Sequence, residues 1–191
     1  MTGHRFARLA AWAAGAAAVG VGGWAGLVSG ALPADLGVGR RTRRLGPRTV
    51  DIAAPRGVVF DLIAQPYLGR TTRAMREKVK VLERGSDMVL AAHYTPLGDR
   101  WTAVTVETVR FTRPERVDFR LVRGPVPYVV ESFTLTAQDA GTRLVYEGVL
   151  GTDLWRAGQW WGQKVAGRWE ETVAASLASV QQEAERRAAR R

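Results

Sequence analysis

Residues 152–180 read TDLWRAGQWWGQKVAGRWEETVAASLASV, with apolar residues at steps of three and four. These residues are Leu154, Trp161, Val165, Trp169, Val173, Leu177 and Val180. Such spacing places them along one face of an α-helix. Gly151, Thr152 and Asp153 offer a break and a helix N-cap at the start of the stretch. A helix of about eight turns needs a large apolar surface to pack on, so the preceding residues must supply one.

The hundred residues before this helix are typical of β-strands. Apolar and polar residues alternate between turn-forming residues and predict strands at 75–81, 88–95, 101–111, 117–123, 129–136 and 142–150. Another strand is expected at 49–53, followed by a helix that begins at Pro55 and ends at Pro66, and by a short helix over 67–74. This order predicts an α+β fold, in which an antiparallel sheet of about six to seven strands curls around the final helix.

The composition excludes several kinds of functional site. The chain has no cysteine and only His4 and His93 as histidines, which excludes disulfides, thiolate catalysis and a Cys- or His-rich metal site. We find no catalytic triad, phosphate-binding loop or dinucleotide fingerprint, and expect no cofactor. Much of the net charge of +10 lies near the two ends of the chain. A nucleic-acid partner would instead call for a basic face with interleaved aromatic residues, so none is expected.

An uncharged apolar segment, residues 9–32, precedes the domain. Its 24 residues exceed the roughly 20 needed to span a bilayer core, and they predict a single-pass membrane anchor after a short tail at 1–8. The alternative is a signal peptide cleaved at Ser29-Gly30-Ala31. Gly22, Gly26 and Gly30 are spaced by four residues, which would let two membrane helices approach closely as a homo-oligomer. An alanine- and glycine-rich tract also produces this spacing by chance.

Arginines near the apolar segment predict its orientation. Two arginines precede the segment, whereas five follow it within 40–48. The positive-inside rule then places the domain on the cytoplasmic side of the cell membrane, with an exported domain as the alternative. Residues 33–47 show no apolar periodicity and are expected to form a basic linker. The folded domain is expected over 48–182, followed by a basic tail at 183–191.

Several short motifs resemble the START/Bet v 1-like superfamily. The carriers of this likeness are Val50-Asp51-Ile52-Ala53-Ala54-Pro55 with Val58-Val59-Phe60, Pro114-Glu115-Arg116-Val117-Asp118-Phe119-Arg120, Gly124-Pro125 and Gly141-Thr142-Arg143-Leu144. They are similar to polyketide cyclase/dehydrase-like and coenzyme Q-binding members, and the likeness covers about residues 48–182. The resemblance implies a helix-grip fold with an apolar cavity between the sheet and the last helix. It also implies a hydrophobic ligand such as a lipid, quinone or polyketide.

Strand alternation predicts which side chains line such a cavity. Matching the apolar faces pairs Phe119 with Phe133, and Phe133 with Tyr146. Glu131 then points inward opposite Gly148, and Arg123 lies diagonally within reach of it. A Glu131–Arg123 pair could orient a ligand head group or act as an acid and base, or it could simply be a salt bridge at the cavity rim. The pattern leaves open whether Glu107 joins them.

The predicted ligand-binding residues therefore come from four strands and the last helix. They are Tyr94, Phe119, Arg123, Glu131, Phe133, Tyr146, Trp161 and Val165. His93 is expected on the exposed face. We hypothesise a membrane-anchored binding or carrier domain for a hydrophobic small molecule. The alternatives are a cyclase or dehydratase that uses Glu131 and Tyr146, and an interaction module whose cavity is filled by its own side chains.

Overall fold

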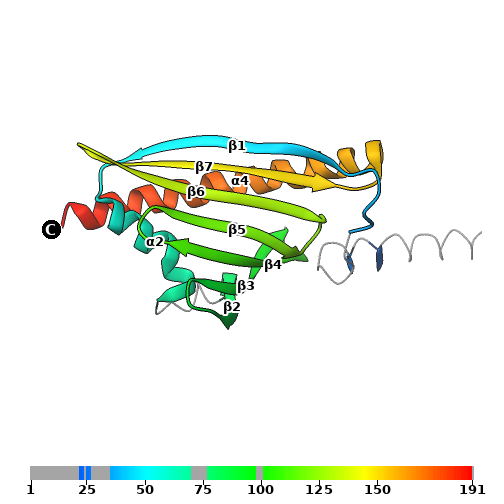
Figure 1. Cartoon of the computed structure of the whole chain (residues 1–191), viewed down its shortest axis with the longest axis horizontal. Coiled ribbons are helices and arrows are strands. Elements are labelled where there is room, and N and C mark those ends of the chain that lie inside the picture. Colours follow the sequence, from blue (N-terminus) through cyan, green and yellow to red (C-terminus); the bar gives the residue numbers. More distant parts are fainter. Residues whose placement is uncertain (1–21, 24, 27–34, 70–76, 98–100, 191) are drawn as a thin grey trace, which may run out of the picture.

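A computed structural model describes residues 22–23, 25–26, 35–69, 77–97 and 101–190 (Figure 1). Most of the predicted membrane segment, the tail before it and most of the short helix expected at 67–74 lie outside these ranges. Residues 22–23 and 25–26 of the predicted anchor are helical. None of the helices in the described ranges is both long and apolar enough to cross a membrane.

The described domain is one seven-stranded antiparallel sheet with two helices. In chain order the elements are β1 (Arg41–Ile52), α2 (Arg56–Leu68), β2 (Val79–Arg84), β3 (Met88–Leu97), β4 (Trp101–Thr112), β5 (Arg116–Arg123), β6 (Tyr128–Gln138), β7 (Gly141–Thr152) and α4 (Trp155–Ala188). The strands lie side by side in the order β1-β7-β6-β5-β4-β3-β2. Because β1 pairs with β7, the first strand lies at one edge and β2 at the other (Figure 1).

β1 begins earlier than the sequence predicts, inside the expected basic linker. Its pairing with β7 starts at Arg41, opposite Thr152. Leu45 is buried in the core, and Arg43 forms an ion pair with Glu170 of α4. An arginine-rich run looks like a linker because β1 is an edge strand whose arginines remain at the surface. The register shifts between Leu45 and Arg48, as in a β-bulge.

α2 starts at Arg56, one residue after the predicted start, with Pro55 as its N-cap, and it continues past Pro66 to Leu68. The predicted end at Pro66 is therefore wrong. A proline inside a helix costs about 3 kcal/mol through its missing N–H and its steric clash. The burial of Tyr67 directly after Pro66, together with Phe60 and Ala64 on the same helix, offsets this cost.

The faces of β6 and β7 agree with the sequence prediction, while the register between β5 and β6 differs. Glu131 pairs with Gly148 and Phe133 with Tyr146, as expected. Between β5 and β6, however, Phe119 pairs with Glu131 rather than with Phe133. The difference is two residues. Because side chains in a strand alternate with a period of two, this shift leaves Phe119 and Glu131 on their predicted inner face.

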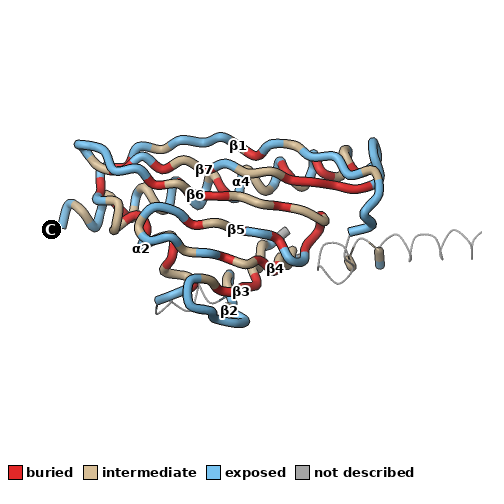
Figure 2. Tube along the Cα trace, in the orientation of Figure 1, coloured by how far each residue is buried: buried red, intermediate tan, exposed pale blue. Residues whose placement is uncertain are grey.

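α4 packs on β1, β7 and α2, on one side of the sheet (Figure 1). Its buried positions include Val173, Leu177 and Ala184, so the helix continues with a buried face beyond the predicted end of the stripe (Figure 2). The predicted N-cap is wrong, because Leu154 occupies that position in a left-handed conformation. A Cβ on Gly158 would lie 1.6 Å from the carbonyl oxygen of Asp153, so this glycine permits the tight entry into α4.

Candidate functional site

Glu131 occupies the inner face of β6, the face that is covered by α4. It pairs with Phe119 of β5 and Gly148 of β7. A Cβ on Gly148 would lie only 2.8 Å from the Cβ of Glu131, so glycine provides the space that the carboxyl side chain needs. Although Glu131 lies deep in the protein, it retains part of its accessible surface. We infer open space beside the carboxyl group.

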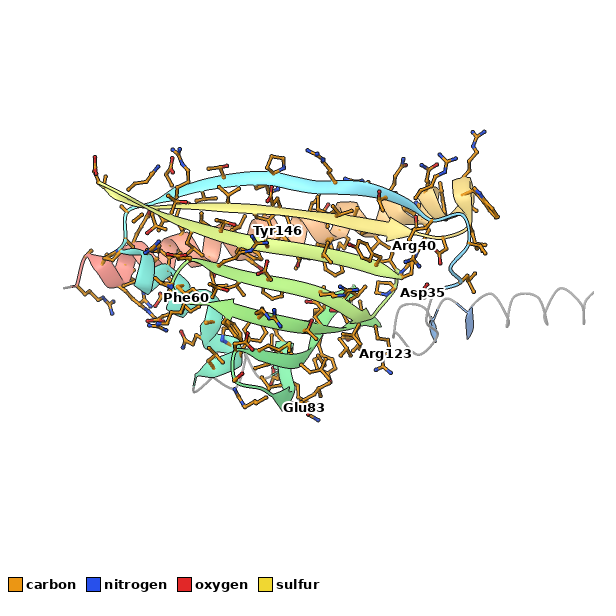
Figure 3. All side chains as sticks on the ribbon, viewed as in Figure 1. Asp35, Arg40, Phe60, Glu83, Arg123 and Tyr146 are labelled. Carbon is orange, nitrogen blue, oxygen red and sulfur yellow. The ribbon has the colours of Figure 1, made fainter. Side chains whose placement is uncertain are left out.

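Two hydrogen bonds hold the Glu131 carboxyl group from different elements. The hydroxyl of Tyr146, on β7, donates to Oε2 over 2.8 Å. The indole Nε1 of Trp169, on α4, donates to the same oxygen over 2.7 Å. Tyr146 itself is fully buried. It is labelled near the middle of the sheet in Figure 3. Among the described residues, none donates a hydrogen bond to Oε1, so that oxygen is available to a ligand.

A second polar cluster lies on the inner face of β3 and β4. Tyr67 of α2 shares a 2.8 Å hydrogen bond with His93 Nε2. His93 Nδ1 lies 3.3 Å from Glu107 Oε2, without the alignment of a hydrogen bond. Glu107 is 5% exposed and therefore points inward, which settles the orientation that the sequence leaves open.

Burial controls the protonation of both carboxyl groups. The pKa of Glu131 is raised to about 8, chiefly by loss of solvation and also by the charge of Glu107; the hydrogen bonds from Tyr146 and Trp169 lower the pKa and are outweighed. Burial likewise raises the pKa of Glu107 to about 7. The same effect lowers the pKa of His93 to about 4, so its imidazole is neutral at pH 7.

A continuous row of aromatic rings runs from one cluster to the other. Ring centroids lie 6.0 Å apart for Tyr67 and Phe119, 5.5 Å for Phe119 and Phe133, and 5.2 Å for Phe133 and Tyr146. The tilted and edge-on contacts are those that aromatic quadrupoles favour. Phe133 remains partly exposed, so this row offers an apolar ligand a surface next to Glu131.

A hollow of about 740 Å³ lies mainly on the outer face of the sheet, and Glu131 and Phe119 also contribute to its lining. Besides Glu131, its charged lining residues are Arg44, Arg110, Arg116, Arg120, Asp118 and Glu147. Two of these arginines form ion pairs: Arg116 with Asp118 at 2.7 Å and Arg110 with Asp87 at 3.5 Å. The hydrogen bonds from Tyr146 and from Trp169 of α4 direct the Glu131 carboxyl group toward the helix, so we place the candidate site on the inner face.

The structure brings most predicted site residues together. Glu131 and Tyr146 share a hydrogen bond, and Phe119 and Phe133 form the aromatic row beside them. Trp161 and Val165 of α4 pack against the same core, and Trp161 Nε1 donates to the carbonyl oxygen of Pro125. These placements agree with the sequence prediction, while contact with a ligand stays a prediction.

Arg123 does not belong to this group. The register shifts between β4 and β5, so that Glu107 pairs with Leu121 and Val106 pairs with Arg123. The extra residue, Val122, reverses the alternation, and the exposed side chain of Arg123 lies at the end of the strand, away from Tyr146 (Figure 3). The predicted Glu131–Arg123 pair is therefore wrong.

His93 and Tyr94 exchange the faces that the sequence predicts. Val89 and Ala91 of β3 are fully buried on the inner face, and His93 shares their alternation. Tyr94 consequently lies on the other face, away from Glu131. The apolar residues on both faces of β3 made its orientation ambiguous. The sequence pattern leaves Glu107 open and does not connect Tyr67 or Trp169 to the site, because their contacts join separate elements.

Solved structures with the same arrangement are found at low sequence identity. The aromatase/cyclase ZhuI from Streptomyces sp. R1128 matches 78% of this chain and 95% of its own, with a TM-score of 0.60 and 19% identity. Neither a protein-family model nor a curated protein matches the sequence. The chain has the helix-grip fold. The START/Bet v 1-like likeness in the motifs is thereby confirmed at the level of the fold.

Two further helix-grip structures show how widely the sequences vary. The di-domain aromatase/cyclase StfQ from the steffimycin pathway has a TM-score of 0.60 at 12% identity, covering 78% of this chain and 52% of StfQ. Norcoclaurine synthase from Thalictrum flavum, in complex with dopamine and hydroxybenzaldehyde, has a TM-score of 0.56 at 9% identity. It covers 75% of this chain and 87% of that enzyme. Such low identities establish the shared fold alone.

Proposed function

We propose that this protein binds a hydrophobic small molecule on the inner face of its sheet and holds one polar oxygen of that molecule at Glu131. The observation that carries this proposal is the carboxyl group itself. It lies deep in the fold, retains accessible surface, and uses only Oε2 for hydrogen bonds from described residues. A ligand group that forms a hydrogen bond with Oε1 in this partly enclosed place gains binding energy.

The hydrogen-bond pattern selects the kind of ligand. Oε2 already accepts hydrogen bonds from Tyr146 and Trp169, so the proton of the neutral carboxyl group belongs on Oε1. Oε1 then donates to an acceptor such as a carbonyl oxygen. The aromatic row beside Glu131 matches a flat or apolar body. A neutral quinone, a polyketide-like ketone or a lipid carbonyl combines both properties.

Solved helix-grip structures support this proposal by analogy. Several of those similar to this chain are aromatase/cyclases, and the norcoclaurine synthase structure contains two small aromatic molecules. We transfer only the capacity of the fold to hold such a ligand between sheet and helix.

The test is native mass spectrometry of the full-length protein in detergent, followed by organic extraction of bound compounds. We expect a co-purifying hydrophobic compound with a carbonyl group. Its binding should survive Glu131→Gln, whose amide NH₂ still donates, and should be lost in Glu131→Leu. Glu147→Gln, on the exposed face of β7, is the matched control. A protein that is empty and does not respond to quinones or ketones in thermal shift would instead support the interaction module.

An enzyme of the cyclase or dehydratase type is the second candidate. The observation in its favour is that the pKa of Glu131 is raised toward neutrality beside an unoccupied carboxyl oxygen. Glu131 would exchange a proton with the ligand, and Tyr146 would hold the carboxyl group in place. Turnover that is lost in Glu131→Gln while the ligand still binds identifies this function; binding without turnover in the wild type identifies a carrier.

The proposal includes a membrane anchor formed by residues 9–32. Its support is the uncharged sequence of that segment. Alkaline extraction of cell membranes tests the anchor, and protease protection of spheroplasts tests the cytoplasmic placement. Release of the protein by alkali, or an N-terminus that starts after Ala31, would contradict an uncleaved anchor.

A further inference from the structure

Five of the large exposed hydrophobic side chains gather at the end of the molecule where the described domain begins. They are Leu36, Val38, Leu154, Trp155 and Trp160, between 46% and 63% exposed, and we call them the tryptophan rim. Backbone hydrogen bonds join the two segments: Leu154 N donates to Val38 O and Trp155 N to Gly39 O. Exposed apolar side chains in such a group mark an interaction surface.

A buried aspartate fixes the rim. Asp153, which is 4% exposed, accepts hydrogen bonds from the backbone N–H groups of Leu36 and Gly37, both over 2.8 Å. Its carboxylate also binds the guanidinium of Arg40, with Nε 2.7 Å from Oδ1. The chain between residues 36 and 40 is thus held on the first turn of α4. These contacts fix the position of residues 36–40 relative to the start of α4.

The length of the remaining connection is short. The uncharged segment ends at Leu32, three residues before Asp35. Three residues span at most about 11 Å when fully extended. If residues 9–32 cross the bilayer, the tryptophan rim lies within the reach of the headgroup region, which adds about 5–7 Å on each side of the hydrocarbon core.

We propose that the tryptophan rim docks on the lipid bilayer and sets the orientation of the domain. Tryptophan prefers this interface because its ring is apolar and its N–H is polar. Exposed basic side chains accompany the rim: Lys164 lies over the Trp160 ring, and Arg156 follows Trp155. They suit an anionic lipid surface. α4 starts at the rim and runs away from it, so the far end of the sheet faces the aqueous phase (Figure 1).

This inference rests on the proposed anchor, so its test separates the two. The absence of cysteine allows a single nitroxide label on the full-length chain. We would place it at Gln163, one turn from Trp160, or at Asp139 in the distant turn between β6 and β7; both positions are exposed. The protein is reconstituted in phosphatidylcholine vesicles with about one quarter phosphatidylglycerol. Accessibility to oxygen and to a water-soluble nickel complex is then measured.

We expect the label at 163 to favour oxygen and the label at 139 to favour the nickel complex. Trp160→Glu should shift the label at 163 toward the nickel complex without loss of folding, because Trp160 is 63% exposed. Vesicles that float with the protein while both labels favour nickel would overturn the docking and leave the anchor intact. Protein that does not float with the vesicles would overturn both.

Discussion

Gly148 lies directly opposite Glu131 on the neighbouring strand, and a Cβ on this glycine would come within 2.7 Å of the carbonyl oxygen of Val130. The close contact is with backbone, which yields less easily than the end of a flexible side chain. Space for an inward carboxyl group therefore depends on the absence of a side chain on the next strand. The alternation of apolar and polar residues in the two strands predicts this pairing of Glu131 with Gly148.

Replacing Gly148 by alanine should destabilise the protein by about 1–3 kcal/mol, because the added methyl group forces β6 and β7 apart. It should also weaken binding of a ligand at Glu131. Urea unfolding followed by circular dichroism measures the first effect. Gly167→Ala is the control: no atom lies within 4 Å of its added Cβ, and alanine favours the helix by about 1 kcal/mol. Equal stabilities for the two variants would contradict the packing argument.

Glu131 should make the folded state less stable as the pH rises. Its pKa is raised from 4.5 to about 8 on folding. Between these values the unfolded chain has released a proton that the folded protein retains, so unfolding becomes easier with increasing pH. Glu131→Gln should remove this contribution, and its stability relative to wild type should increase from pH 5 to pH 8. A pH-independent difference would show that Glu131 ionises normally.

Trp169→Phe should lower the stability of the protein and change the protonation of Glu131. The substitution keeps an aromatic ring but removes the N–H that donates to Oε2. We expect a loss of about 1 kcal/mol for the hydrogen bond and a further rise in the pKa of Glu131. Carbon-13 NMR of labelled glutamate can follow this titration. An unchanged pKa would mean that the indole does not contact the carboxyl group in solution.

His93 should remain neutral well below its ordinary pKa. Burial lowers the pKa of its imidazole from 6.5 to about 4. Between these values the unfolded chain binds a proton that the folded protein does not, so this residue reduces stability as the pH falls from 6.5 toward 4. Proton NMR can resolve the titration because His4 is the only other histidine. His93→Phe should flatten the stability profile in this window; a normal titration would place His93 in water.

Asp153→Ala should destabilise the start of α4, because it leaves the N–H groups of Leu36 and Gly37 without their acceptor. We expect a cost of about 1–3 kcal/mol. Asp153 has a pKa lowered to about 2, chiefly by Arg40, so its contribution holds above pH 4 and is lost as the pH falls toward 2. A double-mutant cycle with Arg40→Ala measures the coupling, and the same cycle on the exposed Arg116–Asp118 pair should give a much smaller value. Similar coupling energies in both cycles would contradict a strong Asp153–Arg40 interaction.

The sequence predicts the fold well where one strong pattern decides the structure. The stripe that includes Val173 and Leu177 predicts α4, and alternation in β6 and β7 places Glu131 opposite Gly148. The errors in strand register and strand face occur where the alternation of apolar and polar residues fits two arrangements. A shift of two residues between β5 and β6 keeps the same faces, and a single extra residue at Val122 reverses them.

The site was predicted less completely than the fold. Glu131 and Tyr146 were found because they lie on adjacent strands with a clear register. Trp169 was expected in the core, but its hydrogen bond depends on how α4 lies across the sheet. Tyr67, His93 and Glu107 meet only when α2 packs beside β3 and β4, a tertiary contact that alternation along a strand does not specify.

The contacts of Asp153 with Leu36, Gly37 and Arg40, which we call the Asp153 lock, have a mechanical consequence. Tension on the N-terminal segment enters the domain at residue 35, where the lock holds the chain on α4, and is passed to β1. β1 is paired along its length with β7, so a pull along its axis strains many hydrogen bonds at the same time instead of opening them one after another. An edge strand in this shear geometry resists force far better than one that is peeled away. A pull along this axis therefore loads the whole β1–β7 pairing before the edge strand can separate from the sheet.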